Sequence, residues 1–223
     1  MIGTKHVTVD GLAFSGKTTL SQLLATRLGG YVLSSGAAYR SIAAYYLAHN
    51  KLADVWGLTV SSVTASLRLE VVSDKEKSTE LSFAVNDLTY STDVLRSEEV
   101  DILAPAFAQY EEVRALVSLA VRNATADRTV VLDGRDAGST ILPSACLKLI
   151  AVCPLKDRVA RRCSRLGQDV SWHKVAACIL ARDILDLPRM KHIHEHPEEY
   201  LAVSTVLPLT EENIDTLEAR VRG

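Results

Sequence analysis

The sequence lacks several features that would place it in a membrane or outside the cell. No run of apolar residues approaches the roughly 20 that a transmembrane helix needs. No basic segment followed by an apolar core precedes the first strand-like run, so we expect no secretory signal. The four cysteines are Cys146, Cys153, Cys163 and Cys178, and none of their spacings is C-x-x-C. We therefore expect reduced thiols and a cytoplasmic protein.

A strong excess of one charge is also missing. The 223 residues include 25 Lys and Arg and 27 Asp and Glu, which gives a net charge of −2 at pH 7 and an isoelectric point near 6.3. This balance gives no support to a nucleic-acid polymer or a membrane surface as partner. We expect a small-molecule substrate and a monomer. Hydrophobic residues make up 48% and charged residues 23%, as is ordinary for a globular domain.

Apolar strand-like runs alternate with helical spacing along most of the chain, and there are no repeats or low-complexity linkers. The runs lie at 6–9, 31–33, 129–132, 147–152 and 201–206. Strands separated by helices predict a parallel sheet of about five strands, covered by helices on both faces. A terminal helix should follow, with Thr210 at its N-cap and a core face of Ile214, Leu217 and Val221.

Residues 63–95 break this alternation. Leu69 and Val71, and later Leu81, Phe83 and Val85, alternate with polar residues. A turn-prone stretch from Ser73 to Thr79 separates the two runs, and Asn86-Asp87 follows the second. The pattern predicts a small antiparallel sheet inserted into the α/β chain.

The most specific motif follows the first strand directly and matches the Walker A pattern G-x-x-x-x-G-K-[ST]. Its members are Gly11, Leu12, Ala13, Phe14, Ser15, Gly16, Lys17 and Thr18, with Thr19 behind them. The glycines allow a tight turn whose N–H groups point at phosphate oxygens. Lys17 is expected to reach the β- and γ-phosphates, and the Thr18 hydroxyl to bind Mg²⁺. The motif predicts binding of a nucleoside triphosphate.

A second polar group follows the strand at 129–132. Asp133 ends that strand, where it is placed to orient Mg²⁺ or its water shell; the alternative is a helix N-cap. Arg135 is a two-pronged donor for phosphate or carboxylate, and its alternative is a surface ion pair with Asp136.

Further along, Arg182 and Asp186 are four residues apart and share a helix face. This spacing alone favours a solvated ion pair over a clamp for sugar and phosphate. Arg189 lies near the same face, but Pro188 should end or kink the helix there.

Other candidates lie earlier in the chain. Ser34, Ser35, Tyr39 and Arg40 occupy a strand-to-helix junction suited to nucleotide contacts. Arg114 stands among apolar helical positions, either extending its charge to solvent or reaching into a phosphate site.

A histidine-rich segment remains after the last of these arginines. His192, His194 and His196 alternate, so an extended chain would present all three imidazoles on one side, as a Zn²⁺ site needs. A solvated lid segment is the favoured alternative.

Taken together, these landmarks resemble the cytidylate kinase family of nucleoside monophosphate kinases from Val7 to about Leu217. The matching pieces are Val9-Asp10-Gly11, Ser35-Gly36-Ala37-Ala38-Tyr39-Arg40, Leu95-Arg96-Ser97-Glu98-Glu99-Val100, Glu112-Val113-Arg114, Asp133-Gly134-Arg135-Asp136-Ala137-Gly138, and Arg182-Asp183 with Asp186 and Arg189. The resemblance implies a P-loop NTPase fold in a single kinase domain, residues 1–223. It also implies a monophosphate-binding region with the β insertion at about 34–110, and a helical lid at about 155–190.

The resemblance also implies an activity and its residues. The activity is Mg²⁺-dependent transfer of the ATP γ-phosphoryl group to CMP or dCMP, with Lys17, Arg135, Arg189 and Asp133 as the catalytic group. Arg135 and Asp136 would hold the cytosine, Arg182 and Asp186 the ribose, and Arg114 and Arg189 the α-phosphate. Residues assigned to the substrate in total are Ser35, Tyr39, Arg40, Arg114, Arg135, Asp136, Arg182, Asp186 and Arg189. Lid arginines near ATP would be Arg158, Arg161 and Arg162.

The chain departs from the family's pattern at a few positions. The family's loop is richer in Gly, and Phe14 and Thr18 replace that pattern here. Ser34 stands where the family commonly has Asp, Pro188 interrupts the Arg-rich lid, and the histidine segment at 190–197 replaces the usual stretch.

Two other functions stay open on the sequence. One is a kinase for another pyrimidine monophosphate or a small metabolite. The other is a P-loop switch or binding protein without transfer chemistry. For that class, Asn50-Lys51-Leu52-Ala53-Asp54 is one residue too long to match the guanine-reading N-K-x-D pattern.

Overall fold

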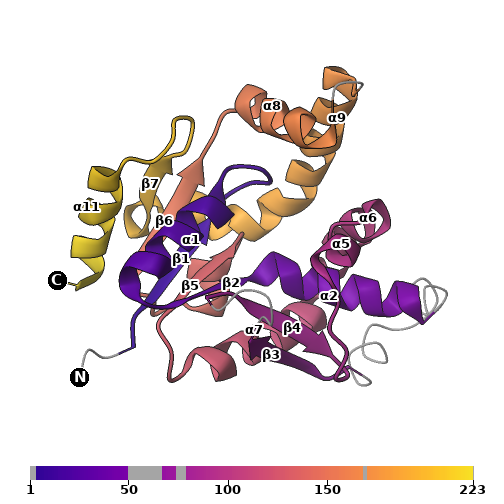
Figure 1. Cartoon of the computed structure of the whole chain (residues 1–223), viewed down its shortest axis with the longest axis horizontal. Helices are drawn as coiled ribbons and strands as arrows, with labels where there is room; N and C mark the ends of the chain where they lie inside the picture. Colours follow the sequence, from indigo (N-terminus) through magenta and orange to yellow (C-terminus); the bar gives the residue numbers. More distant parts are fainter. Residues whose placement is uncertain (1–3, 50–66, 74–78, 168–169, 223) are drawn as a thin grey trace. The chain divides into compact units, whose positions relative to one another are not determined.

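The structure is a computed structural model that describes residues 4–49, 67–73, 79–167 and 170–222 (Figure 1). The chain forms two compact units. The first comprises Met1–Val32 and Thr129–Gly223, and the second comprises Leu33–Arg128. The second unit begins next to the expected boundary at 34 and extends beyond 110. Residues 50–54, which bear on the switch-protein alternative, and residues 74–78 of the predicted turn lie outside the described ranges.

A five-stranded sheet organises the first unit. Its strands are β1 (His6–Asp10), β2 (Tyr31–Ser34), β5 (Val130–Gly134), β6 (Leu147–Val152) and β7 (Leu201–Ser204), in the order β2-β5-β1-β6-β7. Strand β1 pairs in parallel with β5 and with β6, and β6 pairs in parallel with β7. Five strands were predicted at these places, and the last is shorter than its predicted range.

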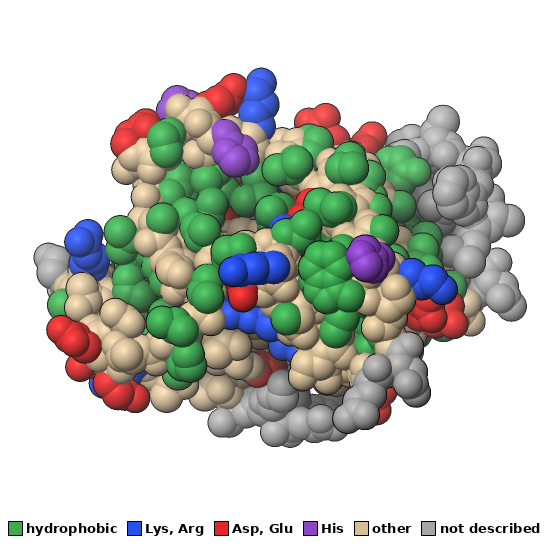
Figure 2. All heavy atoms as spheres, turned by 90° about the horizontal axis from the view of Figure 1, so that it is seen from above, with side chains coloured by type: hydrophobic (Ala, Val, Ile, Leu, Met, Phe, Trp, Pro, Cys, Tyr) green, Lys and Arg blue, Asp and Glu red, His purple; other side chains and the backbone are tan. Residues whose placement is uncertain are grey.

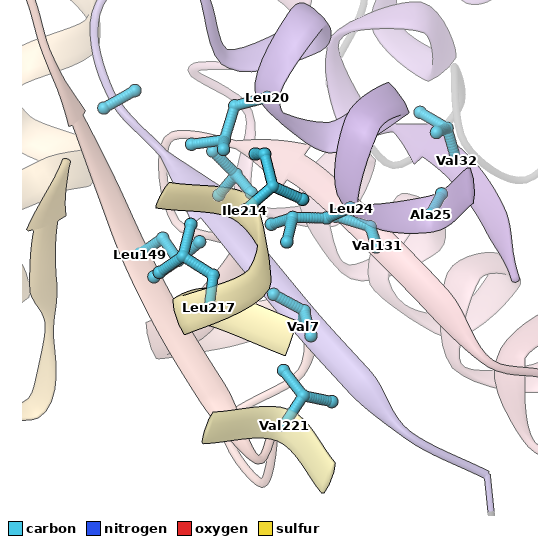
Figure 3. Close-up of a cluster of buried hydrophobic side chains, with 12 residues drawn as sticks. Val7, Leu20, Leu24, Ala25, Val32, Val131, Leu149, Ile214, Leu217 and Val221 are labelled. Carbon is cyan, nitrogen blue, oxygen red and sulfur yellow. The ribbon is translucent and has the colours of Figure 1, made fainter. Parts of the chain in front are cut away.

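The core of this unit lies between the sheet and two helices, α1 (Lys17–Leu28) and α11 (Glu211–Arg222). Figure 3 shows Leu20 and Leu24 of α1 directed toward the same cluster as side chains from the strands and from α11. The members from α11 are Ile214, Leu217 and Val221, as the sequence predicted. The Thr210 hydroxyl accepts a hydrogen bond from the Asn213 N–H at 3.2 Å, which confirms the predicted cap.

The predicted lid region contains two longer helices, α8 (Leu155–Leu166) and α9 (Trp172–Asp186). They share a small apolar cluster of their own, made by Val159, Val175, Ala176 and Ile179. Short elements complete this part of the chain: the π-helix η1 (Ala137–Ile141), the 3₁₀ turns η2 (Leu187–Met190) and η3 (Pro197–Glu199), and α10 (Lys191–Glu195). Pro188 lies in η2, where α9 has ended, as predicted.

The second unit contains the predicted antiparallel sheet. Strands β3 (Leu69–Ser73) and β4 (Leu81–Val85) pair with Leu69 opposite Val85 and Ser73 opposite Leu81. Among the described residues of this unit, the helices are α2 (Ser35–Ala48), α5 (Thr92–Leu95), α6 (Glu98–Phe107) and α7 (Glu111–Thr125). Helix α2 packs against α6 and β4, and α7 packs against β3. The predicted fold class, a parallel sheet with helices and a small antiparallel insertion, is confirmed.

The strand order locates the ligand-binding edge of the large sheet. From β1 the chain crosses to β2 on one side, and from β5 it crosses to β6 on the other. In such sheets ligands bind outside the carboxyl ends of the strands where the direction of the connections reverses. Here that point lies between β1 and β5, so the loop after β1 and the turn after β5 meet at one edge.

The described surface is mixed in character. On the face in Figure 2, Lys and Arg side chains lie among Asp and Glu side chains, with hydrophobic side chains between them. Exposed hydrophobic residues include Ile184 and Leu207. None of the described helices is long and apolar enough to span a bilayer.

Leu23 and Leu24 offer a matched test of the core. Leu24 is fully buried, whereas Leu23, its neighbour on the same helix, is 38% exposed. We expect Leu24→Ala to lower the free energy of unfolding by about 2–5 kcal/mol, because it leaves a cavity against the sheet. Leu23→Ala should change it by less than about 1 kcal/mol. Urea denaturation of both variants measures this, and equal losses would contradict the assigned packing.

Candidate active site

The loop between β1 and α1 requires glycine at two positions. Gly11 has φ 146° and Gly16 has φ 85°, both unfavourable for residues with a side chain. A Cβ atom at Gly11 would lie 2.7 Å from the Ala151 carbonyl oxygen, closer than atoms can approach. The sequence-predicted phosphate-binding turn therefore has the backbone shape that such a turn needs.

Lys17 begins α1 and is buried within this loop. Its Nζ donates to the Leu12 carbonyl oxygen at 2.7 Å. Burial lowers the pKa of Lys17 well below its ordinary value, and the nearby Arg135 charge lowers it further. Negative phosphate oxygens would supply the charge that favours the ammonium form, so the site is suited to a polyphosphate.

Thr18 and Asp133 form the predicted metal-binding pair. The Thr18 hydroxyl donates to a carboxylate oxygen of Asp133 at 3.1 Å, although the two residues are 115 positions apart. Both supply oxygen, the donor that Mg²⁺ prefers. The Ser15 Oγ is buried in the same loop and has no hydrogen-bond partner among the described residues, so a phosphate oxygen would satisfy it. The residues present thus fit Mg²⁺ bound together with a nucleotide.

Asp133 lies inside β5 and caps no helix, so the alternative of an N-cap is wrong.

Two arginine–carboxylate pairs lie beyond the end of β5. Arg189 binds Asp136 through two hydrogen bonds, of 2.6 and 3.2 Å. Arg135 donates from Nε to Asp186 at 2.7 Å. Because Asp136 and Asp186 are 4% and 5% exposed, the alternatives of a surface Arg135–Asp136 pair and a solvated Arg182–Asp186 pair are wrong.

The electrostatics of Asp186 also place Arg182 near this group. Burial alone would raise the pKa of Asp186, but Arg135, Arg182 and Arg189 outweigh it and hold the pKa below its usual value. The Arg182 charge also lowers the pKa of Lys17. The structure therefore brings Lys17 together with those charged residues of the first unit that the sequence assigned to the acceptor nucleotide.

Asp10, at the end of β1, fixes the turn that carries this group. Its two carboxylate oxygens accept the N–H groups of Ala137 at 2.8 Å and of Gly138 at 2.9 Å. Complete burial raises the pKa of Asp10 to about 6, although the two backbone hydrogen bonds oppose the shift. Asp10 belongs to the matching piece Val9-Asp10-Gly11, but nothing in the sequence pattern predicted this role.

The predicted lid arginines contact the loop itself. Arg158, which is 4% exposed, donates to the Ala13 carbonyl at 3.3 Å and pairs with Asp183 at 2.8 Å. Arg161 donates to the Phe14 carbonyl at 3.4 Å, and the Arg162 guanidinium lies over the Phe14 ring, 5.1 Å from its centroid. Direct contact of these arginines with ATP stays a prediction. Asp183 was missed as a loop support, although it stands beside Arg182 in the quoted motif.

The remaining candidates belong to the second unit. Ser35 and Tyr39 are buried at the start of α2, and Arg40 pairs with Asp101 at 3.3 Å. Arg114 donates to the carbonyl oxygens of Ala108 and Gln109, which follow the end of α6. Their assignment to the acceptor stays a prediction.

The histidine segment is helical and not extended. His192 and His196 lie four residues apart with ring centroids separated by 4.6 Å, so the less favoured Zn²⁺ interpretation, which needed an extended chain, does not hold, and the favoured solvated lid segment stays a prediction. His192 contacts Glu199 and His196 contacts Glu198, both at 3.4 Å. In the described part of the chain, no group of three or more His, Cys, Asp or Glu side chains is placed to hold a metal ion.

A phosphate-binding loop at the central strand, with buried arginines and carboxylates on the same edge of the sheet, belongs to the P-loop kinases. The family model described as Cytidylate kinase matches residues 7–221. The chain therefore belongs to the cytidylate kinase family, which confirms the family and the enzyme class that the sequence predicted.

Three curated relatives show the extent of this similarity. The cytidylate kinase of Thermotoga sp. (strain RQ2) is 31% identical over 220 residues, covering 97% of this chain and 96% of the relative. That of Bdellovibrio bacteriovorus is 33% identical and covers 97% of each chain. That of Dichelobacter nodosus is 35% identical, covering 83% of this chain and 82% of the relative.

The raised pKa of Asp10 predicts a pH dependence of stability. Since the pKa is about 6 in the fold and 3.8 ordinarily, the folded state binds the proton more tightly than the unfolded state does. The contribution of Asp10 is therefore fully present below about pH 4 and is lost as the pH rises through about 6. Asp10→Asn cannot ionise and should lack this loss. Urea denaturation of both proteins between about pH 4 and pH 7 measures the difference, and parallel curves would contradict the prediction.

Proposed function

We propose that this chain transfers the γ-phosphoryl group of ATP to CMP or dCMP, giving the corresponding diphosphate. The observation that supports this most strongly is the arginine–carboxylate group of the β5 turn and α9–η2, on the sheet edge that also carries the phosphate-binding loop. Family membership supplies the nucleotide specificity.

The loop binds the donor in this proposal. The main-chain N–H groups of residues 11–18 and the Lys17 ammonium hold the β- and γ-phosphates of ATP. Thr18 and Asp133 would hold Mg²⁺, which when bound neutralises negative charge on those phosphates. Thr19 is assigned to the donor with the loop, and Arg158 and Arg162 are assigned to it from the resemblance.

The buried pairs prepare the arginines for the acceptor. Asp136 holds Arg189, and Asp186 holds Arg135, with both guanidiniums oriented before any ligand arrives. A monophosphate offers oxygen atoms for the same planar donors, so binding exchanges one charged partner for another. Asp136 would hold the cytosine amino group, and Asp186 with Arg182 the ribose hydroxyls. Ser35, Tyr39, Arg40 and Arg114 of the second unit are assigned to the same nucleotide.

The transfer needs no strong general base. The attacking phosphate oxygen is largely deprotonated near pH 7, because the second pKa of a phosphate monoester is about 6. Catalysis then consists of alignment and charge neutralisation by Lys17, Arg135 and Arg189. Closure of the lid at 155–190 would exclude water and limit hydrolysis of ATP.

We further propose that the protein acts in the cytoplasm and as a monomer.

The first test is a coupled assay of ADP release with Mg·ATP and each of CMP, dCMP, UMP, dTMP, AMP and GMP. We expect strong preference for CMP and dCMP.

Lys17→Ala should lower kcat by about a hundredfold or more, because the Lys17 charge acts on the transferring phosphoryl group. Near-normal turnover in folded Lys17→Ala would contradict that role.

Other outcomes of the acceptor assay identify the alternatives. Preference for another monophosphate would show that the specificity differs from the family's, with Ser34 the first residue to examine. Turnover with none of the six, in protein that binds ATP, would favour a metabolite kinase or a protein that only binds nucleotide.

Two aspartates separate the donor side from the acceptor side. Asp136→Asn removes a charge from the acceptor group and should raise KM for CMP by about tenfold or more, with KM for ATP changed much less. Asp183→Asn weakens the hold on Arg158, which supports the loop, and should instead raise KM for ATP. Steady-state kinetics of the two variants measure both constants. Equal effects on both substrates in either variant would show that the two sides are misassigned.

A further inference from the structure

Phe14 occupies a backbone conformation that a bulky residue rarely adopts. Its φ is 60°, in the left-handed region where glycine is at ease and a side chain costs about 1–2 kcal/mol. It lies at the tip of the phosphate-binding loop, between two glycines that also have positive φ, Gly11 and Gly16. The conformation persists only if surrounding contacts hold it.

The Phe14 side chain provides such contacts. Its ring packs against the apolar cluster that joins α8 to α9, whose buried members are Val159, Val175, Ala176 and Ile179. The guanidinium of Arg162, on α8, lies over the ring at 5.1 Å from its centroid. The Phe14 ring at the loop tip is thus partly buried against the cluster that α8 and α9 share.

The backbone of the loop is held from the same direction. The carbonyl oxygens of Ala13 and Phe14 accept hydrogen bonds from Arg158 and Arg161 of α8. The Ser15 carbonyl accepts one from the Thr205 hydroxyl. In a trans peptide the carbonyl and the next N–H point in opposite directions. Holding these carbonyls outward therefore aims the N–H groups of residues 14–16 toward the inside of the loop, where the Ser15 N–H donates to the Leu12 carbonyl oxygen at 3.3 Å.

Helix α9 also contributes to this support. Asp183 binds Arg158 at 2.9 Å and 2.8 Å, and both side chains are almost completely buried. Asp183 thereby holds the arginine that contacts Ala13. The loop is consequently attached to α8 through one ring and two carbonyls, and to α9 through the shared cluster and this ion pair.

We propose that Phe14 is a positioning residue that anchors the loop to α8 and α9 and so holds its N–H groups ready for phosphate before ATP binds. The inference rests on the proposed binding of ATP. Packing of the ring against the α8–α9 cluster offsets the backbone strain. Movement of α8 and α9 away from the sheet would pull on the loop tip, so lid opening and release of the phosphates are linked.

Two substitutions of Phe14 separate anchoring from strain. Phe14→Gly relieves the unfavourable φ and removes the anchor, whereas Phe14→Leu keeps an apolar side chain for the cluster. Leu166→Ala, at an exposed position of α8, is the control for altering the same helix. Two readouts apply: the Kd of Mg·ATP by titration calorimetry without any acceptor, and amide hydrogen exchange of α8 and α9 without nucleotide.

We expect Phe14→Gly to weaken Mg·ATP by about tenfold, because the loop must then be ordered on binding, and to speed exchange in α8 and α9. Phe14→Leu should stay within about threefold of wild type in Kd, and Leu166→Ala should match wild type. ATP binding by Phe14→Gly that equals or exceeds wild type, with unchanged exchange, would overturn the proposal.

If Phe14→Gly unfolds the protein, Ile179→Ala tests the anchor from α9. Loosening the cluster there should weaken Mg·ATP, although Ile179 is not part of the loop. Faster exchange in α9 with an unchanged Kd would overturn the proposal. Wild-type protein that binds no Mg·ATP would refute the proposed function. The exchange measurement, made without nucleotide, would still decide whether Phe14 anchors the helices.

Discussion

A charge buried in a protein must be paired or solvated by polar groups, because an uncompensated one costs several kcal/mol. The first unit buries Lys17, Asp133, Asp136, Arg158 and Asp186, each at most 7% exposed. The contacts that satisfy them connect segments distant in sequence: the loop, the end of β5, the lid helices and η2. The same requirement makes the group receptive to a ligand. A phosphate can replace a carboxylate beside an arginine, and it supplies the negative charge that the buried lysine needs.

Strand β1 connects two of the segments that carry these buried charges. It lies at the centre of the sheet, its last residue is Asp10, and the phosphate-binding loop begins with the next residue. Asp10 binds the backbone just after Asp136, so the loop after β1 and the turn after β5 are tied to one point. A displacement of either segment would strain the two hydrogen bonds that Asp10 accepts. Burial of this carboxylate raises its pKa, so the rigid connection costs folding free energy when Asp10 is ionised.

The fold was predictable from the sequence because its signals are local and repeated. Apolar runs, glycine-bracketed turns and the alternation in β3 and β4 each depend on a few neighbouring residues. The Walker A spelling located the loop for the same reason. Pairings across the chain were less accessible: spacing suggested that Arg182 binds Asp186 in solvent, whereas Asp186 is buried against Arg135, 51 positions away. The support of Ser15 by Thr205, 190 positions away, has no local signal at all.

The contacts of Phe14 in the structure explain a departure from the family pattern that the sequence alone does not explain. In the sequence, Phe14 is a bulky residue in a loop that is richer in glycine in the family. In the structure the backbone keeps the turn that glycine would allow, and the ring packs against the α8–α9 cluster. Strain in the loop and the packing of Phe14 against α8 and α9 are therefore two parts of one arrangement, in which contacts of the ring help to hold the strained backbone. The identity of the residue does not indicate this attachment between the loop and α8–α9, which only the contacts show.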